Sequence, residues 1–118
     1  MRVYIAAPYT LGDVAVNVRN AIMAADRLVE LGHQPYVPHL THFWHLVSPK
    51  PYEFWLELDM TFLNHWAEAL LRLPGKSSGA DGEVERAKKI MIPVYYSIDE
   101  FRTADKSGKE IIFEGGKE

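Results

Sequence analysis

Residues 69–87, ALLRLPGKSSGADGEVERA, decide the fold that the sequence predicts. The stretch begins with a short apolar run that is typical of a buried strand, and Pro74 and Gly75 end that run. A small polar loop follows, and a helical pattern begins near Ala80. We therefore expect a strand, a glycine-bearing loop and a helix, with Glu83 in the first turn of the helix. Because the backbone N–H groups of a helix start favour negative charge, a carboxylate there tends to stay ionised. Glu83 is a candidate nucleophile or charge stabiliser, although a simple match to the helix dipole would also explain it.

The composition is typical of one soluble globular domain. A chain of 118 residues can bury one hydrophobic core and is too short for two, so we expect a single domain over residues 1–118. The net charge of −3 argues against binding to nucleic acid or to an anionic membrane surface. The lack of cysteine excludes disulfides, thiolate catalysis and Cys-ligated zinc. We find no signal peptide and no apolar run long enough to span a bilayer, and we expect a cytoplasmic protein.

Strands alternate with helices along the chain. We expect strands at 3–7, 34–38, 69–73 and 92–96, a final edge strand at 110–113, and helices at 14–31, 51–65, 80–90 and 97–101. Asp13 is placed to cap the first helix and Gly32 to end it. Residues 39–50 are expected to form an irregular loop because prolines flank them, and 104–108 a polar turn. This order predicts an α/β, three-layer, Rossmann- or flavodoxin-like domain with a mainly parallel sheet of four to five strands.

Ligands of such sheets bind beyond the carboxyl ends of the strands, where the strand order reverses. Three segments should meet there: residues 8–12, 39–50 and 74–82. The glycine-bearing loop lacks the P-loop pattern, and no G-x-G-x-x-G follows the first strand. Hydrolysis of nucleoside triphosphates and dinucleotide redox chemistry are therefore disfavoured.

Asp59 is the most informative single position. On the predicted helix its neighbours at three and four residues are all apolar: Trp55, Leu56, Phe62 and Leu63. A carboxylate in an apolar stripe costs several kcal/mol unless it is paired, hydrogen-bonded or protonated. It either caps neighbouring backbone or lies at a pocket wall with a raised pKa, where it is a candidate for proton transfer.

Two other acids are expected to be solvated. Glu57 has polar neighbours, and Glu85 has Lys88 and Lys89 at ion-pairing distance along its helix. Asp59 and Glu83 remain as two carboxylates that would converge at the strand ends. Such a pair suits cleavage of a glycosidic bond, in which one group attacks the sugar carbon and another manages the proton.

The 39–50 loop carries His39, His42 and His45, three residues apart. They could gather around a metal if the loop formed a helical turn, but no carboxylate follows at ligand spacing. We favour a hydrogen-bonding wall in which Phe43 and Trp44 offer a stacking surface, or a purely structural loop. We expect no metal and no cofactor.

In these residues the sequence resembles the nucleoside 2-deoxyribosyltransferase family, which includes 2′-deoxynucleoside 5′-phosphate N-hydrolases. The resemblance runs from Val3-Tyr4-Ile5 to Pro93-Val94-Tyr95, and its most specific part is Ser77-x-Gly79-x-x-x-Glu83-x-x-x-Ala87, preceded by Asp59. The chain is also similar to small members of that superfamily with PHLTHFWH at residues 38–45.

The resemblance implies roles for several of these side chains. Glu83 would be the nucleophile that forms a glycosyl-enzyme ester, Asp59 would assist proton transfer at the base, and Tyr4 would position nucleophile and sugar. Ser77 would contact the sugar. The expected substrate-binding residues are Ser77, Gly79, Tyr9, His39, His42 and Trp44. The resemblance also implies a homo-oligomer, a dimer or tetramer, because a neighbouring subunit often completes the pocket in that family.

The sequence therefore favours an N-glycosidase or N-glycosyl transferase acting on a nucleoside or nucleotide. Two alternatives stay open. One is a non-catalytic module that binds a nucleotide at the same strand ends, and the other is a metal-dependent hydrolase built on the three histidines.

Overall fold

The structure is a computed structural model that describes residues 1–104. The predicted strand at 110–113 lies outside the described residues, as does the predicted polar turn except for Ala104, which ends the last helix. The elements in chain order are β1 (Arg2–Ala6), α1 (Val14–Glu30), β2 (Gln34–Tyr36), the 3₁₀ turn η1 (Pro38–Leu40), α2 (Thr41–Val47), α3 (Tyr52–His65), β3 (Ala69–Arg72), α4 (Ser78–Lys89), β4 (Val94–Tyr95) and α5 (Ile98–Ala104).

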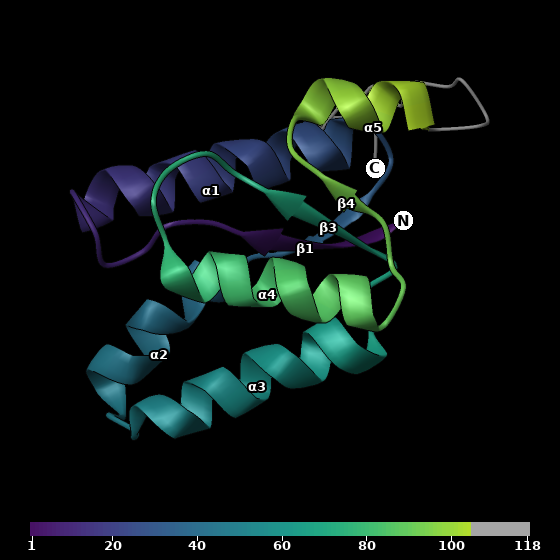
Figure 1. Cartoon of the computed structure of the whole chain (residues 1–118). Coiled ribbons are helices and arrows are strands. Elements are labelled where there is room, and N and C mark those ends of the chain that lie inside the picture. The colour runs from purple at the N-terminus through teal and green to yellow at the C-terminus, as the bar shows by residue number, and fades with distance from the viewer. Residues whose placement is uncertain (105–118) are drawn as a thin grey trace, which may run out of the picture.

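The four strands form one sheet in the order β2-β1-β3-β4, and every neighbouring pair is parallel. Helices α1 and α5 cover one face, and α3 and α4 cover the other (Figure 1). The predicted three-layer α/β fold with a parallel sheet is therefore confirmed. Within residues 1–104, no helix has the length and apolar character that crossing a membrane requires.

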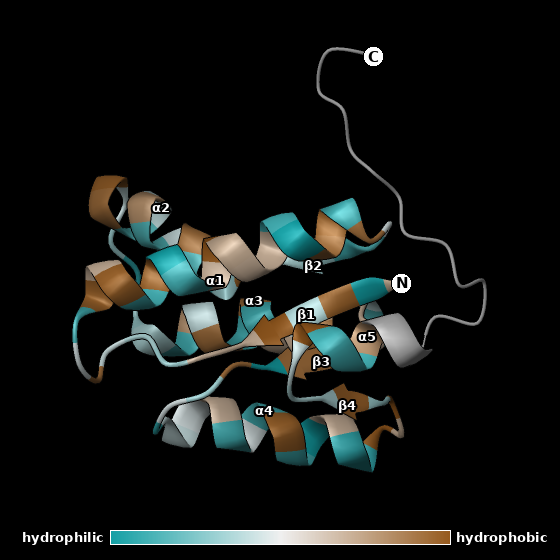
Figure 2. Cartoon of the chain, turned by 90° about the horizontal axis from the view of Figure 1, so that it is seen from above, coloured by the Kyte–Doolittle hydropathy of each residue, from teal (hydrophilic) through white to brown (hydrophobic). Residues whose placement is uncertain are grey.

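The core is divided between the two faces because neighbouring side chains on a strand point to opposite sides. Val3 and Ile5 of β1 pack with the α1 and α5 side, whereas Tyr4 and Ala6 pack with the α3 and α4 side. Figure 2 shows apolar residues concentrated along β1, β3 and β4 between the helical layers. Strand β2 is an edge strand, which tolerates the proline at position 35.

The caps of α1 agree with the prediction. The side chain of Asp13 accepts hydrogen bonds from the backbone N–H groups of Ala15 and Val16, at 2.9 and 3.2 Å. Gly32, just past the helix end, has a φ of +89°, which glycine adopts at little cost. Asp13 fixes where the loop of residues 7–12 ends, and Gly32 fixes where the chain leaves α1 for β2.

Two predictions about the elements near the strand ends were wrong. Residues 38–47 are helical rather than irregular, since Pro38 occupies the first positions of η1, where no N–H is needed, and Pro49 comes after α2 has ended. Helix α4 begins at Ser78 with Ser77 as its cap. Glu83 therefore lies in the second turn of α4, beyond the reach of the helix dipole at the first turn.

Candidate active site

A cavity of about 730 Å³ opens at the carboxyl ends of β1 and β3, where the strand order reverses. Residues from all three predicted segments line it, together with residues of α3. The strand ends, the start of α4 and helix α2 gather at the left of Figure 1. Of the predicted site residues, those that line the cavity are Tyr9, His39, His42, Asp59, Ser77, Gly79 and Glu83.

The Glu83 side chain extends from α4 into the cavity, and a residue of the sheet donates a hydrogen bond to it. The hydroxyl of Tyr4, a fully buried residue of β1, donates a hydrogen bond to Oε2 of Glu83. Burial, followed by the nearby negative charges of Glu83 and Asp59, raises the pKa of Tyr4 well above its usual range. Tyr4 is thus a permanent hydroxyl donor that orients the Glu83 carboxylate.

The Glu83 carboxyl group does not stay ionised as a first-turn acid would. Burial raises its pKa from the ordinary 4.5 to about 7. The hydrogen bond from Tyr4 lowers this pKa, the charge of Asp59 raises it, and the charge of Arg72 lowers it. Near neutral pH, Glu83 therefore exists in both protonation states.

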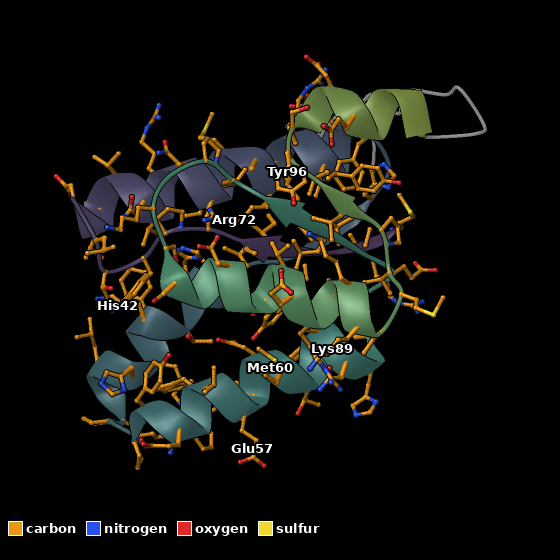
Figure 3. The ribbon with its side chains drawn as sticks, in the orientation of Figure 1. His42, Glu57, Met60, Arg72, Lys89 and Tyr96 are labelled. Carbon is orange, nitrogen blue, oxygen red and sulfur yellow. The ribbon has the colours of Figure 1, made fainter. Side chains whose placement is uncertain are left out.

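Asp59 lies on α3 across the cavity from α4. Burial raises its pKa from 3.8 to about 6, and a hydrogen bond from Tyr36 opposes that rise. The Tyr36 hydroxyl donates to Oδ1 of Asp59 at 2.9 Å. Glu57, two residues earlier on the same helix, is exposed and points away from the body of the molecule (Figure 3). The contrast shows that α3 turns Asp59 selectively toward the cavity.

The loop between β3 and α4 is held by Arg72, which is only 9% exposed. Its guanidinium donates to the carbonyl oxygens of Leu73 and Gly75 and to Oδ1 of Asp81. Gly75 has a φ of +117°, and a Cβ there would lie 2.8 Å from Cγ of Pro8. The loop between β3 and α4 and the loop of residues 7–12 therefore pack closely against each other at the strand ends.

Ser77 serves first as the cap of α4, because its Oγ accepts a hydrogen bond from the N–H of Ala80 at 3.1 Å. Its hydroxyl hydrogen remains available as a donor toward the cavity that it lines. Lys76, which sequence reasoning did not select, lines the same wall and adds a positive charge beside the helix start.

Each of the three histidine rings forms a hydrogen bond with a different residue of the chain. Nε2 of His39 lies 2.9 Å from the carbonyl oxygen of Pro8, so this nitrogen carries the proton, and burial lowers the pKa of the ring. The Tyr9 hydroxyl bonds to Nδ1 of His42. Nδ1 of His45 accepts from the indole N–H of Trp55 at 2.8 Å. Within the described part of the chain, no three His, Cys, Asp or Glu side chains group as a metal site.

The structure does not bring Trp44 into the cavity with the other expected binding residues. Trp44 does not line the cavity, and its ring packs edge-on against Trp55 at 5.0 Å and Phe54 at 6.0 Å. On a helix, residues three apart share a face and residues two apart do not. His42 and His45 accordingly face the cavity together, while Trp44 turns away. Trp55 takes the place expected for Trp44 in the cavity wall.

Sequence reasoning did not select Tyr36 or Lys50, and it named His45 only as one of the three loop histidines. Tyr36 is paired with Tyr4 in the parallel register of β1 and β2, so tyrosines at matching positions of the first two strands were the available signal. For Trp55 the available signal was its spacing from Asp59. It stands four residues earlier, so the two side chains share one helix face.

Comparison with solved structures supports the fold. The chain is similar to the structure of a 2-deoxyribosyltransferase from the psychrotolerant bacterium Bacillus psychrosaccharolyticus, with a TM-score of 0.67 over 97% of this chain and 100% of that one. The two sequences are 14% identical, so the likeness is one of fold. No curated protein matches the chain significantly in sequence.

A match to a protein family covers the part of the sequence that forms the sheet and most of its helices. Residues 1–97 match the family described as a domain of unknown function, DUF7768, and this range includes every element from β1 to β4 and both cavity carboxylates. Since the match covers most of the 118 residues, the chain belongs to the DUF7768 family.

Proposed function

We propose that this protein cleaves or transfers the N-glycosidic bond of a nucleoside or a nucleoside 5′-phosphate. The observation that carries the proposal is the arrangement of Glu83 and Asp59 in one cavity, with a buried tyrosine donating to Glu83. A volume of about 730 Å³ is within the usual range for small-molecule sites. The deoxyribosyltransferase-like fold supports this substrate class by analogy.

In the proposed first step, the ionised Glu83 carboxylate attacks the anomeric carbon of the sugar. The C–N bond breaks, its electron pair passes to the base, and Asp59 gives the base a proton. The product is a glycosyl ester of Glu83 and a free base. Water or a second base then attacks the same carbon and releases Glu83, with Asp59 accepting the proton. No metal or cofactor takes part in this route.

The proton balance of the two carboxyl groups sets how much of the protein is ready for this route. Their raised pKa values, about 6 for Asp59 and about 7 for Glu83, place the one-proton form of the pair near neutral pH. Since the pKa of Glu83 is the higher, this proton rests mainly on Glu83, and the productive arrangement, with Glu83 ionised and Asp59 protonated, is the less populated one-proton form. Because the groups interact, the pair shares two macroscopic pKa values rather than one for each residue.

The remaining cavity walls match the two halves of such a substrate. Tyr52, Trp55 and Leu56 form an apolar side on which a base can stack. Lys50 and Lys76 provide positive charge that favours a 5′-phosphate. The neutral His39 ring and the Tyr9–His42 pair supply hydrogen-bonding groups for the sugar.

A substrate panel tests the proposal. The protein is incubated with ribonucleosides, 2′-deoxynucleosides and their 5′-phosphates, with and without an added free base, and products are separated by chromatography. We expect free base or base exchange from at least one substrate, a loss of at least a hundredfold with Glu83→Ala, and little change with Glu85→Ala, an exposed acid on the same helix.

Absence of turnover across the panel would overturn the proposal, as would full activity in Glu83→Ala. Thermal stabilisation by a nucleotide without any turnover would instead support the non-catalytic binding module, because a ligand that binds only the folded state raises its stability.

A further inference from the structure

We propose that Tyr36 is a positioning residue that determines which of the two cavity carboxyl groups holds their shared proton. The role of that proton rests on the proposed function, in which Asp59 must be protonated and Glu83 ionised. Tyr36 does not line the cavity, and its hydroxyl reaches the pair through its hydrogen bond to Asp59.

The ring of Tyr36 is fixed by aromatic neighbours on two elements of the fold. It stacks on Phe62 of α3 with centroids 4.1 Å apart and planes 10° from parallel. Trp66 contacts it edge-on at 6.4 Å, and Tyr4 of the adjacent strand lies 5.6 Å away. Because these contacts fix the ring, the hydroxyl has one direction, and it points at Oδ1 of Asp59 at 2.9 Å.

The two tyrosines form a matched pair. Tyr4 and Tyr36 are register partners on β1 and β2, and each donates its hydroxyl to one carboxyl group, Tyr4 to Glu83 and Tyr36 to Asp59. A hydrogen-bond donor stabilises the ionised form of its acceptor. Tyr4 therefore drives the shared proton toward Asp59, and Tyr36 drives it toward Glu83.

Other charged groups around the pair also act on the pKa values of the two carboxyl groups. An ionised Asp59 raises the pKa of Glu83, and Arg72 of β3 lowers it. The titratable groups that line the same cavity from the remaining elements are Tyr9, His39, His42, His45, Lys50, Tyr52 and Lys76. Among the described residues, only Tyr36 donates a hydrogen bond to the Asp59 carboxylate, so removal of its hydroxyl acts directly on Asp59.

Removing this hydroxyl should move the proton in a defined direction. In Tyr36→Phe the ring contacts remain and the donor is lost, so the pKa of Asp59 rises by about one unit. Asp59 then holds the proton over a wider pH range, and the pKa of Glu83 falls because a neighbouring negative charge is lost. The productive arrangement then makes up a larger share of the one-proton form, so the maximum of kcat/KM rises, while the alkaline limb moves by much less than one unit because Glu83 already dominates the last proton loss.

The direct test is a carboxyl carbon NMR titration of the unliganded full-length protein. Wild type is compared with Tyr36→Phe and with Tyr95→Phe, a control that removes a tyrosine hydroxyl from β4 on the other face of the sheet. We expect Asp59 to titrate about one unit higher in Tyr36→Phe only. An unmoved Asp59, or an equal change in Tyr95→Phe, would overturn the proposal.

A double-mutant comparison separates proton placement from simple loosening of the fold. In an Asp59→Asn background, Tyr36→Phe should leave the titration of Glu83 unchanged, because the coupling passes through the Asp59 charge. A change of Glu83 in that background would contradict the inference. These titrations need no substrate, so they decide the role of Tyr36 even when the substrate panel gives no turnover and the proposed function fails.

Discussion

The raised pKa of Glu83 predicts that this side chain destabilises the folded protein at neutral and alkaline pH. In the folded state burial raises the pKa from 4.5 to about 7, so the folded protein binds this proton more tightly than the unfolded chain does. Stability from this group is therefore fully present below about pH 4.5 and is lost as the pH rises toward about 7. One pKa unit corresponds to about 1.4 kcal/mol, so the loss reaches about 3 kcal/mol at pH 8 as an upper value.

Glu83→Gln removes the charge while keeping the size of the side chain and an oxygen that can accept from Tyr4. We expect the variant to match wild type at pH 4.5 and to exceed it by up to about 3 kcal/mol in free energy of unfolding at pH 8. Urea unfolding at a series of pH values measures this difference from the midpoint and slope. Groups that do not interact with Glu83 contribute equally in both proteins, so they cancel in the comparison, whereas Asp59 is coupled to Glu83 and contributes to the difference.

Glu85→Gln is the matched control, since Glu85 is exposed on the same helix. Its stability curve should run parallel to that of wild type over the whole pH range. If the Glu83→Gln curve also ran parallel, the burial of an ionisable Glu83 would be refuted, and with it the proton balance proposed for the cavity.

Three further outcomes follow from the site. For a substrate that turns over, kcat/KM should follow a bell-shaped pH profile with its maximum between about 6 and 7, and a flat profile from pH 5 to 9 would contradict a shared proton. Gly75→Ala should cost roughly 1–3 kcal/mol of stability in denaturant unfolding, because its φ of +117° is strained for alanine and the new Cβ meets Pro8; an unchanged midpoint would show that the loop is not locked. Trp55→Ala should raise KM at least tenfold and Trp44→Ala much less, because only Trp55 lines the cavity; equal effects in steady-state kinetics would show that the aromatic wall is assigned wrongly.

The elements with strong local signals were predictable. The continuous apolar run that includes Val3, Tyr4 and Ile5 marks a strand buried on both faces, and the Asp13 cap and Gly32 end of α1 appear in the structure where the sequence placed them. These signals are local because each depends on a few neighbouring residues. They were sufficient to predict an α/β fold with a mainly parallel sheet and the edge of the sheet at which the cavity lies.

The helix start beside Glu83 was harder to place. Gly79 and Gly82 weaken the helical pattern, so the sequence suggested a start near Ala80, whereas the Ser77 cap begins the helix at Ser78. With this earlier helix start, Glu83 is not an ionised acid stabilised by the helix dipole. It is a buried acid whose pKa is raised.

The roles of Tyr36 and Trp55 could not be predicted because they depend on how distant elements pack. Tyr36 reaches Asp59 only because β2 pairs with β1 and α3 lies against that end of the sheet. The sequence favoured Trp44 as the stacking residue because the rotation of α2 about its axis was not known. Sheet register and helix rotation are tertiary properties, and they decide which of several suitable side chains enters a site.

The central claim is that Glu83 becomes covalently bonded to the sugar during turnover. The most direct measurement is mass spectrometry of the full-length protein after acid quenching of its reaction with a 2′-deoxynucleoside that it turns over, followed by peptide mapping. We expect a mass increase of one deoxyribosyl group on the peptide that contains Glu83 and no such increase in Glu83→Gln. Turnover with the same adduct on another side chain, or with undiminished rate in Glu83→Gln, would contradict it.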